Sequence, residues 1–341
     1  MRKMVVGMVG VGGFGTYRRQ TMRDSGLFTL AAVCDRSAET LEKAAKEEGA
    51  KAAGSFDELL KFPGLEGIVI STGADSHAPF AIAAMKAGLH VFVEKPLCSS
   101  VAEVQALRSA QRETGRVVGM GHAHNASQPT MMLVRHYIDS GMLGTVTAYE
   151  ENSSHSGGLI IKPGDWRGLA AKNPGGMLFQ CGVHCFHSLT HLFGPVKAVA
   201  AMMRYDVNPN TETADAANVL CRHESGMIGT LNTYHTTAYL HELRVFGTGG
   251  NLYVSTHDGK ASYQKRLVSA TEERVAATGP AAPAWSAWGN LKTWYEASVL
   301  GKGEADPSLE HGVRAVLPVF AAEVAAKEKR EVEVGEIERR G

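Results

Sequence analysis

The chain has 341 residues, enough for two domains of ordinary size that each bury their own core. Lysine plus arginine and aspartate plus glutamate both number 35, so the net charge is zero and no basic field is available to hold nucleic acid or an anionic membrane. No apolar run approaches the roughly 20 residues of a membrane span. We therefore expect a cytoplasmic protein with a small-molecule ligand and with no nucleic-acid or membrane partner.

A glycine-rich turn follows the first predicted strand, residues 4–9. Gly10, Gly12 and Gly15 form the pattern G-x-G-x-x-G, in which glycine allows a tight turn, close approach of a pyrophosphate and close packing of the next helix. A helix and a second strand follow, and this strand ends at Asp35, about 20 residues after the glycines. The order of these elements is typical of a dinucleotide-binding unit.

Asp35 is expected to accept hydrogen bonds from an adenosine ribose and to repel a 2′-phosphate. It therefore favours NAD, while the neighbouring Arg36 weakens that preference and keeps NADP as the alternative. The competing interpretation makes Asp35 a cap for the helix that opens at Ser37.

Strands and helices alternate up to residue 121, which predicts a doubly wound parallel sheet. One buried strand, residues 91–93, stops at Glu94, Lys95 and Pro96. Ligands of such sheets bind outside the carboxyl ends of the strands, so Lys95 is a candidate acid, base or anion anchor. Taken alone, this stretch is better explained by a solvated Glu94–Lys95 pair at the strand end. The predicted parallel sheet and glycine turn around this stretch favour a ligand site at Lys95.

Together these features resemble the family of glucose-fructose oxidoreductase, inositol dehydrogenase and MocA oxidoreductases (Gfo/Idh/MocA). The resemblance continues over a strand end at Ser71 and Thr72, followed by His77, and over nearly the whole chain. It implies a Rossmann domain, residues 1–121, and an α+β domain with a large open, mostly antiparallel sheet, residues 122–341. Because this bond is cis in some relatives, Lys95–Pro96 is also a candidate for a cis peptide.

In function, the resemblance implies a nicotinamide dinucleotide and hydride transfer at a secondary alcohol of a sugar or polyol, with Lys95 close to the reacting oxygen. The residues it assigns to the cofactor are Gly10, Gly12, Gly13, Phe14, Gly15, Asp35, Arg36, Ser71, Thr72, His77, Glu94 and Lys95.

A second motif begins at Gly175 and Gly176. Relatives have an aspartate and then, four residues later, a histidine on one helix face. Here His184 is present, but Gln180 replaces the aspartate. A neutral amide can orient a hydroxyl but cannot take its proton, so His184 and Lys95 are expected to carry the proton transfer.

His187 stands where relatives often have another aspartate. On a regular helix, residues 180, 184, 187, 188 and 191 share a face. Gln180, His184, His187 and His191 could thus meet a metal together with His122, His124 or His155. Packing histidines are the favoured interpretation, so we assign no metal. His187, His155 and Gln180 stay candidates for substrate binding.

Trp166 and Arg167 place an aromatic face beside a guanidinium, which suits a sugar and matches a similar pair in relatives. The competing interpretation is a core tryptophan next to a surface salt bridge.

The strands predicted after residue 195 form a sheet with one uncovered face, and they cover residues 198–203, 217–222, 227–234, 242–246 and 251–255. We expect a second copy of the chain to cover it, giving a homo-oligomer, either a dimer or a tetramer. Two other functions stay open. One is glycoside or ether cleavage through a transient keto sugar, with or without a metal. The other is a non-catalytic cofactor-sensing regulator, against which Lys95 and His184 argue.

Overall fold

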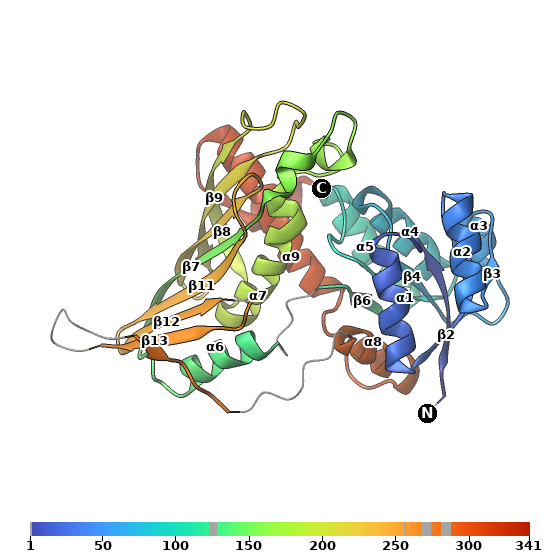
Figure 1. Cartoon of the computed structure of the whole chain (residues 1–341), viewed down its shortest axis with the longest axis horizontal. Coiled ribbons are helices and arrows are strands. Elements are labelled where there is room, and N and C mark those ends of the chain that lie inside the picture. The colour runs from blue at the N-terminus through green and yellow to red at the C-terminus, as the bar shows by residue number, and fades with distance from the viewer. Residues whose placement is uncertain (1, 123–127, 256, 267–273, 281–287) are drawn as a thin grey trace. The chain divides into compact units, whose positions relative to one another are not determined.

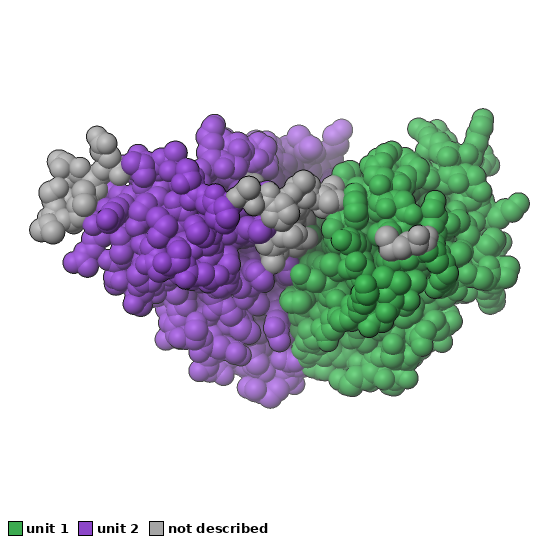
Figure 2. All heavy atoms as spheres, turned by 90° about the horizontal axis from the view of Figure 1, so that it is seen from below, with its two compact units in different colours: residues 1–123, 286–313, 341 green, residues 124–285, 314–340 purple. Residues whose placement is uncertain are grey.

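The computed structural model describes residues 2–122, 128–255, 257–266, 274–280 and 288–341. The chain forms two compact units, coloured separately in Figure 2. Residues 1–123, 286–313 and 341 form the first unit, and residues 124–285 and 314–340 form the second.

The first unit is built on a parallel six-stranded sheet in the order β3-β2-β1-β4-β5-β6. This order is that of a doubly wound nucleotide-binding sheet, as the sequence predicts. Its strands are β1 (Met4–Val9), β2 (Phe28–Cys34), β3 (Lys51–Ala52), β4 (Gly67–Ile70), β5 (His90–Val93) and β6 (Val118–Met120). Its helices are α1 (Phe14–Ser25), α2 (Ala38–Glu48), α3 (Phe56–Leu60), α4 (Ala74–Lys86), α5 (Val101–Thr114) and α8 (Gly289–Leu300).

The register of this sheet brings three strand ends into line. Val9 of β1 pairs with Ile70 of β4, and Ile70 pairs with Val93 of β5. The residues that follow these strands, among them Gly10 and Glu94, therefore lie along one edge of the sheet, where ligands of doubly wound folds bind.

Helix α8 belongs to the first unit, although the sequence analysis places everything after residue 121 in the second domain. The reason is Trp294, which is fully buried and stacks on Phe28 with ring centroids 5.6 Å apart. A methyl group at Gly119 of β6 would lie only 2.9 Å from Trp294, so the indole covers this strand closely. Sequence order did not reveal this return of the chain.

The second unit contains a nine-stranded sheet in the order β14-β13-β12-β11-β7-β10-β9-β8-β15. Only the pair β7 and β10 is parallel, so the sheet is mostly antiparallel, as predicted. Its strands are β7 (Val146–Ser154), β8 (Val196–Arg204), β9 (Ala216–His223), β10 (Ile228–Tyr234), β11 (Leu240–Gly247), β12 (Gly250–Ser255), β13 (Ala261–Lys265), β14 (Val275–Ala276) and β15 (Val332–Glu333). In Figure 1, helices α6 (Pro129–Asp139), α7 (Val183–Phe193) and α9 (Leu309–Glu328) lie on one face of it.

The charged end of the chain, residues 330–341, is structured. After β15 it forms a helix, α10 (Val334–Arg340). Ile337 of this helix is buried, and Glu336 forms ion pairs with Arg330 and Arg340. These contacts hold a segment whose composition alone suggests a solvated end.

None of the helices in the described part of the chain is both long and apolar enough to cross a membrane.

Replacing Trp294 tests the attachment of α8. We expect Trp294→Ala to lower the free energy of unfolding of the first unit by about 3–5 kcal/mol, because a large side chain leaves a cavity in the core. Urea denaturation followed by circular dichroism measures the loss, and Trp166→Ala, at an exposed position, is the control. A loss below about 1 kcal/mol would show that α8 is not part of this core.

Candidate active site

The glycine turn is closely packed. Gly10 has a φ of 79°, and a methyl group there would lie 2.4 Å from the carbonyl oxygen of Ser71, which follows β4. A methyl group at Gly15 would lie 2.1 Å from the carbonyl oxygen of Gly10. Side chains are therefore excluded at both positions, so α1 begins close to the strand ends. This is the backbone cradle that a dinucleotide pyrophosphate requires at a helix N-terminus.

Asp35 directly follows β2 and faces this turn. Its Oδ2 accepts a hydrogen bond from the backbone N–H of Val11 at 2.9 Å, and its Oδ1 accepts one from Ser37 at 3.0 Å. The cap of α2 is Ser37, whose hydroxyl accepts from the N–H of Thr40, so the capping role does not fall to Asp35. Arg36 is exposed. The carboxylate is thus fixed beside the glycine turn.

The end of β5 contains a buried ion pair. Glu94 accepts a hydrogen bond from Nε of Arg18 in α1, with a distance of 2.6 Å from Nε to Oε1, and the exposed fractions of the two side chains are 6% and 3%. Lys95, the next residue, is half-buried. The Lys95–Pro96 peptide is cis, so this candidate is confirmed. Glu94 and Lys95 are therefore not the solvated pair of the competing interpretation.

His77 in α4 lies behind the same turn and is buried. Its Nδ1 lies 2.6 Å from the carbonyl oxygen of Pro96, and its Nε2 lies 3.1 Å from that of Thr72. Burial lowers the pKa of the imidazole, while both carbonyls and Glu94 favour its charged form. The ring joins the segment after β4, which begins with Ser71 and Thr72, to the turn after β5.

In the second unit, the predicted helix of His184 begins with an unusual turn. Gly175 and Gly176 both have positive φ, and the N–H of Gly175 donates to Glu323 of α9 at 2.6 Å. Residues Leu178–Gly182 then form a π-helical turn before α7 begins. Such turns are frequent at functional sites. The regular helix on which the predicted face of residues 180 to 191 depends therefore begins only at Val183.

The histidines of α7 differ in exposure. His184 and His187 are buried, with 9% and 4% of their surface exposed, whereas His191 is exposed. In the part of the chain that the structure describes, no group of three or more His, Cys, Asp or Glu side chains could hold a metal ion. His124 of the predicted set lies outside the described residues.

His155 follows β7 and is partly buried. Its Nδ1 accepts a hydrogen bond from the backbone N–H of Gly157 at 2.9 Å, so the neutral ring carries its proton on Nε2. That nitrogen lies 3.7 Å from Sγ of Cys181, next to Gln180. The ring of His235 stands edge-on to His155 at 5.1 Å, and burial lowers the pKa of His235 to about 4. The imidazoles of His155 and His235 thus lie together, and His155 adjoins Cys181 of the π turn.

Trp166 and Arg167 lie side by side, as predicted. Trp166 is 38% exposed and is not a core residue. Arg167 stands 5.4 Å from the centre of the Trp166 ring and pairs with Asp165 at 2.7 Å. This arrangement leaves an accessible aromatic ring beside a guanidinium.

A buried carboxyl lies on the strand that α7 covers. Glu151 of β7 is 6% exposed and hydrogen-bonded to the thiol of Cys185, the residue after His184. Its Oε2 has no hydrogen-bond partner among the described residues. Burial raises the pKa of Glu151 to about 7, although the Cys185 hydrogen bond lowers it. The carboxyl is therefore largely protonated in mildly acidic solution.

Three residues of these sites were not singled out from the sequence: Arg18, Glu151 and His235. For His235 a signal exists, because Leu231, Thr233 and His235 alternate as buried residues along and just beyond β10. For Arg18 and Glu151 the sequence shows only a polar residue in a helix or strand. Their buried partners come from distant segments.

The first unit, with its glycine turn, the carboxylate after β2 and the aligned strand ends, defines a nicotinamide-dinucleotide-binding protein of the Rossmann class. Comparison with protein families agrees. A model described as the oxidoreductase family with an NAD-binding Rossmann fold matches residues 4–122, and a model of the GFO/IDH/MocA C-terminal domain matches residues 131–253. The chain therefore belongs to the GFO/IDH/MocA family of oxidoreductases.

Relatives of known activity are similar at low identity. The scyllo-inositol 2-dehydrogenase (NAD(+)) of Bacillus subtilis is 28% identical over 205 residues, which are 58% of this chain and 58% of that protein. The D-apiose dehydrogenase of Paraburkholderia graminis is 25% identical in an alignment that covers 97% of this chain and 90% of that protein. The match to the first of these proteins thus spans less than two thirds of its length.

Solved structures share the fold. A putative NADPH-dependent oxidoreductase from Desulfitobacterium hafniense has a TM-score of 0.90 and 24% identity, and the match covers 99% of each chain. Levoglucosan dehydrogenase in complex with NADH and levoglucosan has a TM-score of 0.86 and 19% identity, covering 97% of this chain and 99% of that one. At these identities the likeness shows the fold alone.

The position of Asp35 predicts a preference for the unphosphorylated cofactor. We expect Asp35→Asn to raise the affinity for NADPH relative to NADH by about tenfold, because a neutral side chain no longer repels the 2′-phosphate. Fluorescence titration with both reduced cofactors measures the ratio. Asp57→Asn, at an exposed site of the same unit, is the control. An unchanged ratio would show that Asp35 does not face the ribose.

The raised pKa of Glu151 predicts a pH-dependent stability. Between about pH 4.3, the ordinary value for glutamate, and pH 7, the folded protein binds more protons at this residue than the unfolded chain. The free energy of unfolding should therefore fall as the pH rises through this window, by up to about 3 kcal/mol. Glu151→Gln should remove that part of the decline.

Urea denaturation at pH 5 and pH 8 measures the difference. Glu150→Gln is the matched control, because this neighbour is exposed on the opposite face of β7. If Glu151→Gln and wild type lose the same free energy between the two pH values, the raised pKa is refuted.

Proposed function

We propose that this protein is an NAD-dependent dehydrogenase or reductase that interconverts a secondary alcohol and a ketone in a sugar, a polyol or a related compound, with NADP as the alternative cofactor. The observation that carries the proposal is the position of Lys95. It directly follows the buried strand β5, on the edge of the sheet that also holds the glycine turn. An amine at this edge can serve proton transfer at a ligand bound there.

The cradle at the glycine turn fits a dinucleotide, because side chains are excluded at Gly10 and Gly15. The backbone amides of residues 10–15, including Gly12, Gly13 and Phe14, would hold the pyrophosphate, and Asp35 would hold the adenosine ribose. Ser71, Thr72 and Lys95 would adjoin the nicotinamide end. A bound nicotinamide ring supplies the hydride acceptor or donor for the carbon that bears the alcohol.

Lys95 would exchange the proton of the reacting hydroxyl. Its neighbour Glu94 cannot take that role, because it is buried in the ion pair with Arg18. His184, in the second unit, is the second proton-transfer group that we propose. Imidazole suits this task since its ordinary pKa lies near neutral pH.

Other side chains of the second unit suit the hydroxyls of a sugar or polyol. Gln180 offers an amide donor and acceptor, and His155 offers its Nε2–H. His187 completes this group. Trp166 and Arg167 provide an exposed ring and a cation, a combination that suits the apolar face and the hydroxyls of a sugar.

Replacing Lys95 tests the proposal. Purified protein with NAD⁺ is screened against inositols, pentoses, hexoses and anhydro sugars, and formation of reduced cofactor is followed by absorbance. We expect turnover of at least one of these compounds, and a fall of about 100-fold or more in Lys95→Met, because the general acid or base is lost. NADH titration shows whether the variant still binds the cofactor, which the intact glycine turn should allow.

Lys61→Met is the control, at an exposed lysine of the same unit. Full turnover in Lys95→Met would refute the role of this lysine. A protein that binds NADH but oxidises no member of the panel would count against the substrate class.

A second candidate function is favoured by Gln180, which removes a carboxylate from the site. Oxidation to a transient keto sugar, followed by cleavage of a glycoside or ether and reduction, consumes no net cofactor. Release of the leaving group from an aryl glycoside, without accumulation of NADH, would support this function over simple oxidation.

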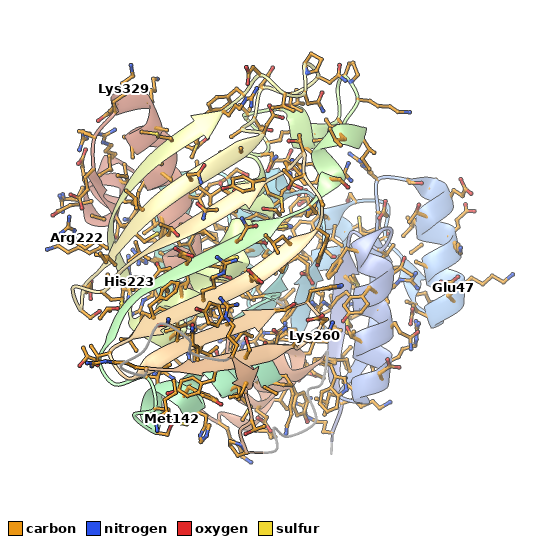
Figure 3. All side chains as sticks on the ribbon, turned by 60° about the vertical axis from the view of Figure 1, so that its left-hand side comes forward. Glu47, Met142, Arg222, His223, Lys260 and Lys329 are labelled. Atoms are coloured by element: carbon orange, nitrogen blue, oxygen red, sulfur yellow. The ribbon has the colours of Figure 1, made fainter. Side chains whose placement is uncertain are left out.

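We also propose that the uncovered face of the nine-stranded sheet packs against a second copy of the chain. Figure 3 looks onto this face, with Arg222 at its edge. Met202, Leu220 and Ile228 expose 82%, 62% and 54% of their surface, and a shallow hollow of about 400 Å³ adjoins the last two. Arg222 forms an ion pair with Glu331 nearby. An apolar centre with a polar rim is characteristic of an oligomer interface.

Light scattering at micromolar concentration tests this arrangement. We expect wild type to be a dimer or tetramer and Leu220→Arg to be a monomer, because two buried guanidinium groups would face each other across a symmetric interface. Lys43→Glu, on α2 of the first unit, should leave the assembly unchanged. A monomeric wild type would refute the proposal.

A further inference from the structure

The two residues beside Lys95 are both held from inside the first unit. On one side, Glu94 accepts a hydrogen bond from Arg18 of α1 at 2.6 Å. On the other side, the carbonyl of Pro96 lies 2.6 Å from the ring of His77 of α4. The lysine therefore stands between two buried contacts that come from different helices.

The Arg18–Glu94 pair lies in apolar surroundings. The guanidinium is 4.8 Å from the centre of the Phe92 ring and 5.9 Å from that of Phe14. Nη1 of Arg18 and Oε2 of Glu94 have no hydrogen-bond partner among the described residues. A methyl group at Gly121 would lie 2.2 Å from Oε2, so the backbone closes over the carboxylate. Each charge of the pair depends on the other for compensation.

We propose that Arg18 is a positioning residue for Lys95: its ion pair with Glu94 neutralises the carboxylate next to the lysine and joins the helix of the glycine turn to the strand end that carries the amine. The role of Lys95 in turnover rests on the proposed function, whereas the charge balance around it does not. Among the described contacts at this turn, Arg18 of α1 is paired with Glu94, and His77 of α4 contacts the carbonyl of Pro96; the thiol of Cys98 follows two residues later.

This charge balance predicts in which direction each replacement shifts the protonation of the Lys95 amine. Without Arg18, an uncompensated carboxylate adjoins Lys95 and favours its ammonium form. Without the charge of Glu94, an uncompensated guanidinium remains and favours the neutral amine. The two single replacements therefore act in opposite directions, and the double replacement restores the balance. A residue that serves only packing would not produce opposite effects.

Trace labelling with acetic anhydride measures the balance directly. The full-length protein is labelled over a range of pH, and acetylation of Lys95 is quantified by peptide mass spectrometry relative to the exposed Lys61. Only the neutral amine reacts. For Arg18→Met we expect the midpoint of labelling to rise by about one pH unit, and for Glu94→Gln to fall by a similar amount. The double variant should lie near wild type.

Equal or same-direction shifts in the two single variants would overturn the proposal. Arg18→Lys keeps the charge and should restore the wild-type midpoint. Circular dichroism and NADH titration show whether each variant is folded. If Arg18→Met does not fold, the test rests on Glu94→Gln alone. A labelling midpoint of Lys95 that does not fall in this variant then refutes the proposal.

The labelling needs no substrate, so its outcome is independent of the proposed function. If the labelling midpoint of Lys95 shifts in opposite directions in the two single variants but the protein has no dehydrogenase activity, the charge balance is supported and the proposed function is refuted. If dehydrogenase activity depends on Lys95 but its labelling midpoint does not shift in the variants, only the inference about Arg18 is refuted.

Discussion

The structure depends on the alignment of three parallel strand ends with almost no space between their backbones. The hydrogen-bond ladder continues past the strands, since Gly10 donates to Cys34, Ser71 to Val9 and Glu94 to Ile70, each at 2.9 Å. Because Gly10 has no side chain, the glycine turn can lie against the carbonyl of Ser71. The cofactor cradle and the lysine therefore share one edge of a rigid sheet, where the fold favours ligands.

Buried charges and carboxyls support both candidate sites from behind. In the first unit, the Arg18–Glu94 pair fixes the residue before Lys95. In the second unit, Glu151 contacts the residue after His184. Such groups are costly to bury, because desolvation disfavours the charged form. Glu94 directly precedes Lys95, and Glu151 contacts Cys185, which directly follows His184. Each buried carboxyl is therefore placed to orient the backbone beside a proposed proton-transfer group.

The sequence predicted what local patterns determine. Periodicity and turn glycines predicted the parallel sheet, and five strands of the second sheet lie within two residues of their predicted bounds. Contacts between residues far apart in the chain could not be predicted from these local patterns. The return of Trp294 to the first unit, the Arg18–Glu94 pair and the π turn before α7 all depend on residues far apart in the chain or on tertiary packing. Short strands such as β3 and β14 have too few residues to show a period.

In the function that we propose, a carbon-bound hydrogen of a sugar or polyol passes to a nicotinamide bound to this protein. The most direct measurement uses substrates carrying deuterium on their carbinol carbons, incubated with the protein and NAD⁺, with mass spectrometry of the recovered cofactor. Our account predicts reduced cofactor containing one deuterium, formed by wild type and not by Lys95→Met. Recovery of NAD⁺ without reduction or deuterium, from a protein shown to bind it, would contradict the account.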